Sequence, residues 1–246
     1  MELGTALGLT LLFLVVAALY ASVGHAGASG YLAAMALLGM APATMRSTAL
    51  VLNILVATIA TIKFSRAGYF SWPVFWPFAL TSIPFAFIGG GLALPNPFYK
   101  TIIGIILLYA ACRLFQATKV PAPATSRSIP LGRALVSGLG IGLLSGLTGT
   151  GGGIFLSPLL LLMGWAEPRQ ASGVSATFIQ VNSVAGLLGQ VSSMQALPAT
   201  LPLWAAAAAV GGWIGAEYGS RRLNNMGMRR FLAMVLVIAG LKLIFA

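Results

Sequence analysis

Long apolar stretches alternate with short polar breaks along the whole chain. Ten such blocks can be drawn, five on each side of a polar stretch at 117–130: 4–22, 27–40, 47–64, 72–94, 98–116, 131–148, 152–164, 172–194, 199–220 and 228–246. Most of them approach the roughly 20 residues that an α-helix needs to cross the hydrocarbon core of a bilayer. A transmembrane barrel would instead show short segments of alternating character. The pattern predicts an all-α polytopic membrane protein, with the first block retained as a membrane segment.

The blocks before and after the polar stretch resemble each other in order. "ASVGHAGASGYLAAMALLGM" (21–40) overlays "LSGLTGTGGGIFLSPLLLLM" (144–163) without a gap, and "STALVLN" (47–53) overlays "ATFIQVN" (176–182). An odd number of crossings in each half would place the second half upside down, a construction used by secondary transporters. We therefore expect two inverted repeats of about five hydrophobic segments, at 1–116 and 131–246, joined by a cytoplasmic linker at 117–130.

Charge distribution bears on how many blocks cross the membrane. The chain is 59% hydrophobic and 7% charged, with a net charge of +11, whereas soluble domains carry about 25% charged residues. Its basic residues lie in short clusters between blocks, which marks cytoplasmic loops and not a nucleic-acid-binding domain. If all ten blocks cross, eleven of the fourteen Lys and Arg share one side; if the second and seventh dip in and return, the charges split almost evenly. The first arrangement is favoured, with both termini outside.

The second and seventh blocks are short, and each follows a glycine-rich loop. The loops are "SVGHAGASG" (22–30) and "SGLTGTGGG" (145–153). A helix of 13 or 14 residues spans roughly 20 Å, less than the 30 Å hydrocarbon core, so we expect half-helices that begin inside the membrane. Helix N-termini and glycine N–H groups bind anions, and loops entering from opposite faces would meet near the midplane. Close helix packing is the alternative explanation for the glycines.

The candidate substrate-binding residues come from these two loops and the segments beside them. Asn53 and Asn182 are amides at matching places in apolar segments, where the alternative to lining a site is a hydrogen bond between helices. Arg46 opens the third block and would either meet an anion or extend to the lipid headgroups. The full set is Ser22, His25, Gly27, Ser29, Arg46, Asn53, Ser145, Thr148, Thr150, Gly151, Gly152, Thr177 and Asn182.

The titratable residues favour an anion over a cation. The acids are Glu2, Glu167 and Glu217, with no Asp, and Glu217 stands one turn before Arg221, where a local ion pair is expected. A cation site built from carboxylates is therefore not predicted, nor is any metal site or cofactor. His25, the single histidine, would either carry a proton or donate one hydrogen bond as a neutral residue.

Two further motifs receive structural explanations. "GASG" (27–30) has the Gly-x-Ser-Gly form of rhomboid-type intramembrane serine proteases. His25 lies in the same loop as Ser29, however, and a catalytic base must be oriented from elsewhere, so we do not expect an enzyme and keep the protease as a remote alternative. Glycines at 89–91 and at 211, 215 and 219 are predicted to be helix-packing surfaces.

With these motifs described, the chain resembles the sulfite exporter TauE/SafE family of membrane permeases. The resemblance rests on "GLLSGLTGTGGGIFLSPLLLLMGW" (142–165), "YASVGHAGASGYLAAMALLGM" (20–40), "QASGVSATFIQVNSVAG" (170–186) and "IGAEYGSRRL" (214–223). It implies export of a small sulfur-containing anion, such as sulfite or the sulfonate sulfoacetate, across the bacterial cytoplasmic (inner) membrane. The alternative is a channel-like permease for another small anion or a metal ion. The expected partners are the anion and the lipid bilayer, with no nucleic acid; a homodimer is left open.

Overall fold

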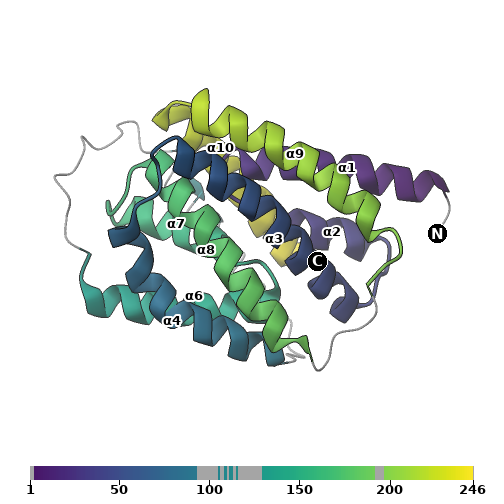
Figure 1. Ribbon diagram of the computed structural model, residues 1–246, viewed down its shortest axis with the longest axis horizontal. Coiled ribbons are helices and arrows are strands. Elements are labelled where there is room, and N and C mark those ends of the chain that lie inside the picture. Colours follow the sequence, from purple (N-terminus) through teal and green to yellow (C-terminus); the bar gives the residue numbers. More distant parts are fainter. Residues whose placement is uncertain are drawn as a thin grey trace.

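The described part of the chain is built from helices packed side by side (Figure 1). The computed structural model describes residues 3–92, 129–191 and 197–245, together with 105, 108, 109, 111, 112 and 115. Its helices in these ranges are α1 (Leu3–Ala21), α2 (Ala28–Leu37), α3 (Pro42–Arg66), α4 (Trp72–Gly91), α6 (Leu131–Thr148), α7 (Gly153–Leu162), α8 (Pro168–Gly189), α9 (Leu201–Arg221) and α10 (Asn225–Phe245). By length and composition, α3, α4, α6 and α8 can each cross a membrane. The prediction of an all-α polytopic membrane protein is confirmed.

The helices follow the predicted apolar blocks closely. α6 covers residues 131–148 as expected, while α2 and α7 have only 10 residues each, or about 15 Å. α3 begins at Pro42, earlier than the predicted start at residue 47, because proline is well suited to the first position of a helix. Most of the fifth block and residues 117–128 of the predicted linker lie outside the described residues.

Two pairs of helices run parallel with their backbones in close contact. In α9, a glycine every fourth residue faces the backbone of α1 and of the residue after it, since Gly211, Gly215 and Gly219 lie opposite Leu14, Ala18 and Ser22. In α6, Phe78, Ser82 and Ala86 of α4 lie in the same way opposite Gly138, Gly142 and Gly146. Small residues let membrane helices approach this closely. The predicted packing role of the glycines in α9 is confirmed.

α3 and α8 cross antiparallel between these pairs. Three side-chain hydrogen bonds join the two helices: Ser47 with Gln190, Asn53 with Ser183, and Thr58 with Gln180. Residue numbers rise along α3 while they fall along α8, so the helices run in opposite directions. α3 also packs on α9, and α8 on α4. Three kinds of contact thus occur once in each half: α1 with α9 and α6 with α4, α3 with α9 and α8 with α4, and α2 with α3 and α7 with α8.

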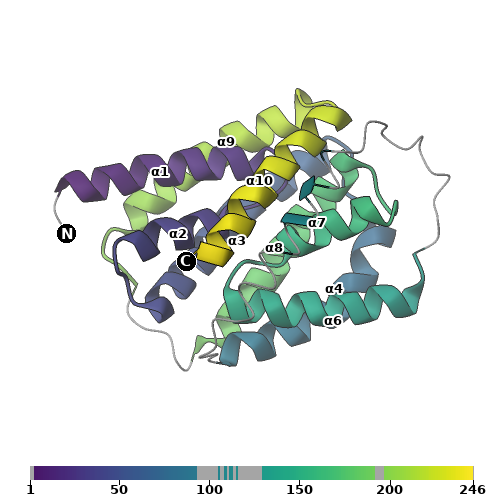
Figure 2. The same ribbon diagram turned by 180° about the vertical axis from the view of Figure 1, so that it is seen from behind.

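The packed units combine helices from both halves of the sequence. One hydrophobic core is drawn mainly from α1, α2, α3, α9 and α10, which we call the first bundle. The other is drawn from α4, α6, α7 and α8, which we call the second bundle. The bundles occupy separate sides of the molecule in both ribbon views and meet where α3 and α8 cross (Figure 2). Division into the two sequence halves is therefore not the division of the packed structure.

Backbone conformation corrects the predicted overlay of the two loops. Left-handed glycines occur at 24, 27 and 39 in the first half and, with the same spacing, at 149, 152 and 164 in the second. The predicted overlay paired Gly27 with Thr150, which is two residues out of register. The predicted overlay was based on similar side-chain types. The two halves instead share the positions at which the backbone has positive φ, a conformation that glycine adopts at least cost. His25 consequently corresponds to Thr150.

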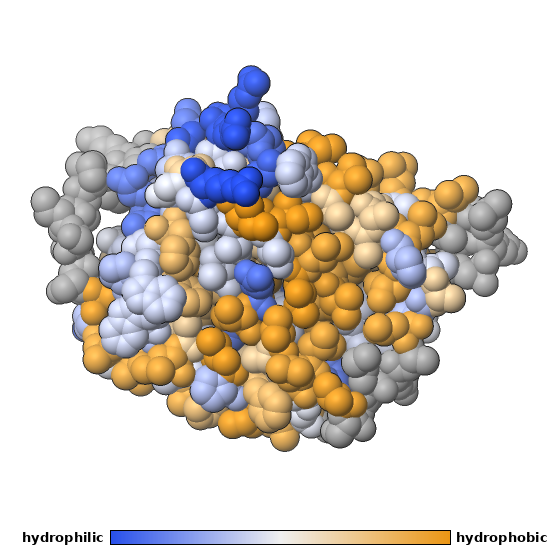
Figure 3. Space-filling model, viewed as in Figure 1, coloured by the Kyte–Doolittle hydropathy of each residue, from blue (hydrophilic) through white to orange (hydrophobic). Residues whose placement is uncertain are grey.

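Basic side chains gather at one end of the molecule, called here the basic end. α3 and α9 finish there, while α6, α8 and α10 begin there, as the contacts of Lys63 with Glu217 and of Arg169 with Leu223 show. These helix ends carry Lys63, Arg66, Arg133, Arg169, Arg221, Arg222, Arg229 and Arg230. Figure 3 shows hydrophilic residues concentrated over this region and apolar residues over the rest of that face. Among basic residues whose side chains the structure describes, Arg46 alone lies at the opposite end, the distribution predicted for ten crossings.

Candidate functional site

The loop before α7 requires glycine for two separate reasons. Gly149, Gly151 and Gly152 all have positive φ, and Gly152 is the left-handed residue that starts the helix. Other L-residues pay about 1–2 kcal/mol for this conformation. There is also no space for a side chain, because a Cβ on Gly151 would lie 2.6 Å from Cγ2 of Ile179. The polypeptide backbone itself therefore forms the surface of this loop.

Polar side chains of three helices face this loop. A Cβ added at Gly151 would lie 3.1 Å from Nδ2 of Asn53 in α3 and 2.8 Å from Oγ of Ser183 in α8. A Cβ added at Gly152 would lie 3.2 Å from Cβ of Ser145 in α6. Asn53 donates a long hydrogen bond to Ser183, at 3.5 Å. Oδ1 of Asn53 and Oγ of Ser145 are buried and have no hydrogen-bond partner among the described residues. Such groups cost about 1–3 kcal/mol each when unpaired, so a ligand that bonded them would offset that cost.

Electrostatics around this loop favours negative charge. α7 begins at Gly153, and the N-terminus of a helix carries a partial positive charge of about half an elementary unit. The two acidic side chains of the described residues lie at the basic end: Glu217 is paired with Lys63 and Arg221, and Glu167 accepts a hydrogen bond from Asn225. In the described structure, no carboxylate faces the loop to cancel that field.

The first loop reaches the second bundle through His25. Nε2 of this buried imidazole lies 2.9 Å from Oγ of Ser157 in α7, and Ser157 donates to Ser175 of α8 at 2.7 Å. The backbone of Gly153, where α7 begins, also lies beside the ring. Nδ1 of His25 has no partner among the described residues. One side chain thus connects the first loop to the half-helix that follows the second loop.

The two loops dock on opposite ends of the crossing helices. Gly24 packs on the backbone of Ser172, near the start of α8 at the basic end, whereas Gly149 packs on Arg46, near the start of α3 at the other end. Each loop therefore contacts the long helix of the opposite sequence half. The prediction that the loops enter from opposite directions agrees with this arrangement. They flank the crossing of α3 and α8, and His25 of the first loop lies beside the backbone of Gly153 at the end of the second.

Several predicted site residues bond only within their own segment. The hydroxyls of Ser22, Thr148 and Thr177 donate to Leu19, Leu144 and Gly173, and Thr148 also contacts Thr150 at 2.8 Å. Such bonds to the preceding turn are the common fate of Ser and Thr in helices. Ser29 of the first loop pairs with Tyr20 at 2.8 Å, beside the helix start at Gly27. The structure therefore does not bring the whole predicted set together.

The two asparagines are not in equivalent surroundings. Asn53 is the twelfth residue of α3 and Asn182 the fifteenth of α8. Nδ2 of Asn182 donates to Phe178 one turn earlier at 2.8 Å, and its Oδ1 is buried without a partner among the described residues. Asn53 faces the second loop, so it is the asparagine that lies at the candidate site.

Arg46, expected to meet an anion or to extend to the lipid headgroups, bonds backbone carbonyls in this structure. Its guanidinium donates to the carbonyls of Gly89, Gly90 and Leu92 at the end of α4, at 2.9, 2.5 and 3.1 Å. The last carbonyls of a helix lack partners in a following turn; of these three, Gly89 also accepts from the N–H of Leu92. Arg46 thus joins α3 of the first bundle to α4 of the second.

Three buried serines of this region, Ser157, Ser175 and Ser183, are not among the site residues predicted from the sequence. Ser157 is the one hydroxyl in a half-helix otherwise composed of Gly, Pro and apolar residues, which is a usable signal. Ser175 and Ser183 stand in an α8 that holds many small polar residues, and only the packing distinguishes them. Tyr31 and Trp204 are not in that predicted set either; both are buried, and their polar atoms have no partner among the described residues.

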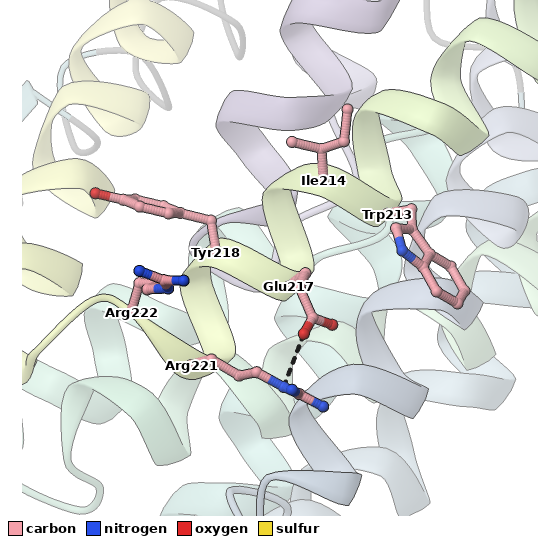
Figure 4. A pocket seen from close by; sticks show the side chains of 6 residues that line it. All are labelled: Trp213, Ile214, Glu217, Tyr218, Arg221 and Arg222. Carbon is pink, nitrogen blue, oxygen red and sulfur yellow. Dashed lines mark ion pairs between the residues drawn. The ribbon is translucent and has the colours of Figure 1, made fainter.

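A surface groove on α9 is separate from this site. It is lined by Trp213, Ile214, Glu217, Tyr218, Arg221 and Arg222 (Figure 4). Glu217 bonds Lys63 at 2.5 Å and Arg221 at 2.8 Å, which confirms the predicted local ion pair with Arg221. Nζ of Lys63 also lies 3.5 Å from the centre of the Trp213 ring. Aromatic residues beside basic ones are typical of a membrane–water interface.

Comparison with known proteins gives a consistent family. The profile of the family described as sulfite exporter TauE/SafE matches residues 9–243. A protein of Sinorhizobium fredii (strain NBRC 101917 / NGR234), named probable membrane transporter protein y4hK, is 42% identical over 246 residues, covering 98% of each chain. No solved structure matches.

Proposed function

Because the chain belongs to the sulfite exporter TauE/SafE family and is a membrane transporter, we propose that it exports a small sulfur-containing anion, such as sulfite or a sulfonate like sulfoacetate. The anion would bind where the second loop meets Asn53 and Ser145. In this proposal the chain forms two inverted repeats with ten crossings. The basic end faces the cytoplasm of a bacterium and both termini face outward, as the positive-inside rule requires.

The observation that carries the proposal is the buried polar group at the start of α7. The side chain of Ser145 and the amide of Asn53 lie against a glycine backbone that begins a half-helix, and Oγ of Ser145 and Oδ1 of Asn53 have no hydrogen-bond partner among the described residues. Oxygen and nitrogen of an amide exchange places by rotation, so Asn53 can present N–H to a ligand. Hydrogen-bond donors and a positive helix end without an opposing carboxylate suit an oxyanion.

A metal ion is a weaker candidate for this site. Among the described residues no three His, Cys, Asp or Glu side chains cluster as a metal would need. Export of an anion is also favoured by an inside-negative potential, worth about 2.3 kcal/mol per charge at 100 mV. Transport therefore needs no coupled ion, and His25 is the candidate residue for proton coupling.

The proposal is tested with Ser145→Ala in purified protein and in proteoliposomes. Sulfite, sulfoacetate, sulfate, thiosulfate and taurine are compared at matched ionic strength, by thermal stabilisation and by counterflow. A hydrogen bond to a charged ligand is worth about 1.5–3 kcal/mol, so loss of the hydroxyl should weaken binding roughly 10- to 100-fold.

Ser82→Ala is the matched control. Ser82 is equally buried and its hydroxyl likewise lacks a partner in the described structure, but it packs against Gly142 between α4 and α6. Equal losses in the two variants, or no selective stabilisation of the parent protein, would remove the support for this site. Saturable counterflow would distinguish a transporter that alternates its access from an open channel.

A further inference from the structure

Two arginines connect the first and second bundles, one at each end of the molecule. Arg46, near the start of α3, bonds the carbonyls at the end of α4. Arg169, near the start of α8, donates from Nε to the carbonyl of Leu223, which follows the end of α9, at 2.7 Å. α3 and α8 are counterparts in the two halves, and so are α4 and α9. The same connection is therefore made twice, in opposite directions.

The guanidinium of Arg169 holds three segments together. Nη2 also donates to the carbonyl of Leu223, and Nη1 donates to the hydroxyl of Tyr69 in the connection between α3 and α4. The Tyr69 ring lies 5.1 Å from the guanidinium carbon. Arg169 of the second bundle thus reaches both the turn after α9 and the end of α3, which belong to the first bundle.

Each arginine lies beside one of the glycine loops. Cγ of Arg46 is 2.9 Å from where a Cβ of Gly149 would be, and Asn53 follows two helical turns later on the same face of α3. At the basic end, Ser172 lies one helical turn after Arg169. The carbonyl oxygen of Ser172 would lie 2.2 Å from a Cβ added at Gly24. Each of the two loops that flank the crossing of α3 and α8 therefore has an arginine close to it.

From this geometry we infer that Arg46 and Arg169 are the two gates of the transport cycle. The Arg46 bonds break when the bundles separate at the Arg46 end, and the Arg169 bonds break when they separate at the basic end. Hydrogen bonds to backbone carbonyls are weak enough, net of hydration, to break and reform during a cycle. Both sets are made in the present structure, which is thus closed at both ends. The inference assumes a transporter that alternates its access, but not the identity of the anion.

Side-specific labelling of cysteine tests this inference. The single native cysteine is removed by Cys112→Ser. Ser183→Cys, beside Gly151, reports on the Arg46 end, and Ser172→Cys, beside Gly24, reports on the basic end. A membrane-impermeant maleimide is applied to each side of oriented vesicles. Arg222→Cys, at an exposed position of the basic end, fixes which side is which.

Arg46→Gln should raise labelling of Ser183→Cys at least 10-fold from the Arg46 end only. Arg169→Gln should do the same for Ser172→Cys from the basic end only. Arg66→Gln, which changes an exposed basic residue at the end of α3, should change neither rate. If a gate variant folds poorly, Arg→Lys at the same position keeps the charge but fewer bonds, and should give a smaller increase on the same side.

Labelling that rises at both ends in one variant would mean that the arginine only stabilises the fold. Unchanged labelling in both variants would also overturn the inference. No substrate is present in this measurement. Failure of the anion proposal would instead appear as an absence of selective stabilisation by sulfur anions, while the labelling pattern would be unaffected.

Discussion

Substituting Gly151 by alanine measures how tightly the second loop is fixed against the crossing helices. Gly151 has φ of +77°, and an added Cβ would lie 2.6 Å from Ile179 and 2.8 Å from the hydroxyl of Ser183. The conformation costs about 1–2 kcal/mol for alanine, and overpacking of a buried site costs about 1–3 kcal/mol more. We expect Gly151→Ala to destabilise the protein by about 2–5 kcal/mol.

Gly164→Ala separates the two contributions. Gly164 has φ of +66° but nothing within 4 Å of an added Cβ, so only the conformational cost of about 1–2 kcal/mol applies. Equilibrium unfolding by SDS in mixed micelles gives both free energies, and their difference is the packing cost at Gly151. In a double-mutant cycle, Ile179→Ala should relieve part of that cost. Equal destabilisation by the two glycine variants would show that the loop relaxes freely and would refute the reasoning.

The remaining predictions concern His25 and the contact of α1 with α9. If His25 carries a proton, His25→Gln should flatten the pH dependence of transport; an unchanged profile in a proteoliposome flux assay would exclude that role. Gly215→Leu should prevent stable folding, because even a Cβ would lie 2.0 Å from the carbonyl of Ala18. Gly8→Ala, with open space around it, should raise the free energy of unfolding by up to about 1 kcal/mol; size-exclusion profiles and SDS unfolding would reveal any deviation.

The sequence predicts the helices well because their signal is local. Length and continuity of the apolar blocks place α6 at its observed bounds and identify α2 and α7 as too short to cross alone. Positive-inside counting also agrees with the described ends, since Arg46 lies apart from the other described basic side chains. These properties depend on composition along the chain and not on which helices pack together.

The features that the sequence did not reveal depend on packing. The role of Arg46 follows from the meeting of the start of α3 with the end of α4, and no residue near position 46 indicates this. Ser157 and Ser175 belong to the site only because His25, from another bundle, hydrogen-bonds Ser157, which in turn bonds Ser175. The register error between the loops had a different cause, since the sign of φ is kept where residue types have changed.

The mixed composition of the two bundles also constrains how the protein is made. α1 leaves the ribosome first, yet the helix whose glycines match its backbone, α9, is synthesised last but one. During most of translation the first helix must therefore wait in the membrane without its permanent neighbour. A polypeptide that ends before residue 201 would leave α1 exposed to lipid or to quality control. Separately expressed halves would have to exchange helices to become stable, so biogenesis of this protein is completed only after its last segments are inserted.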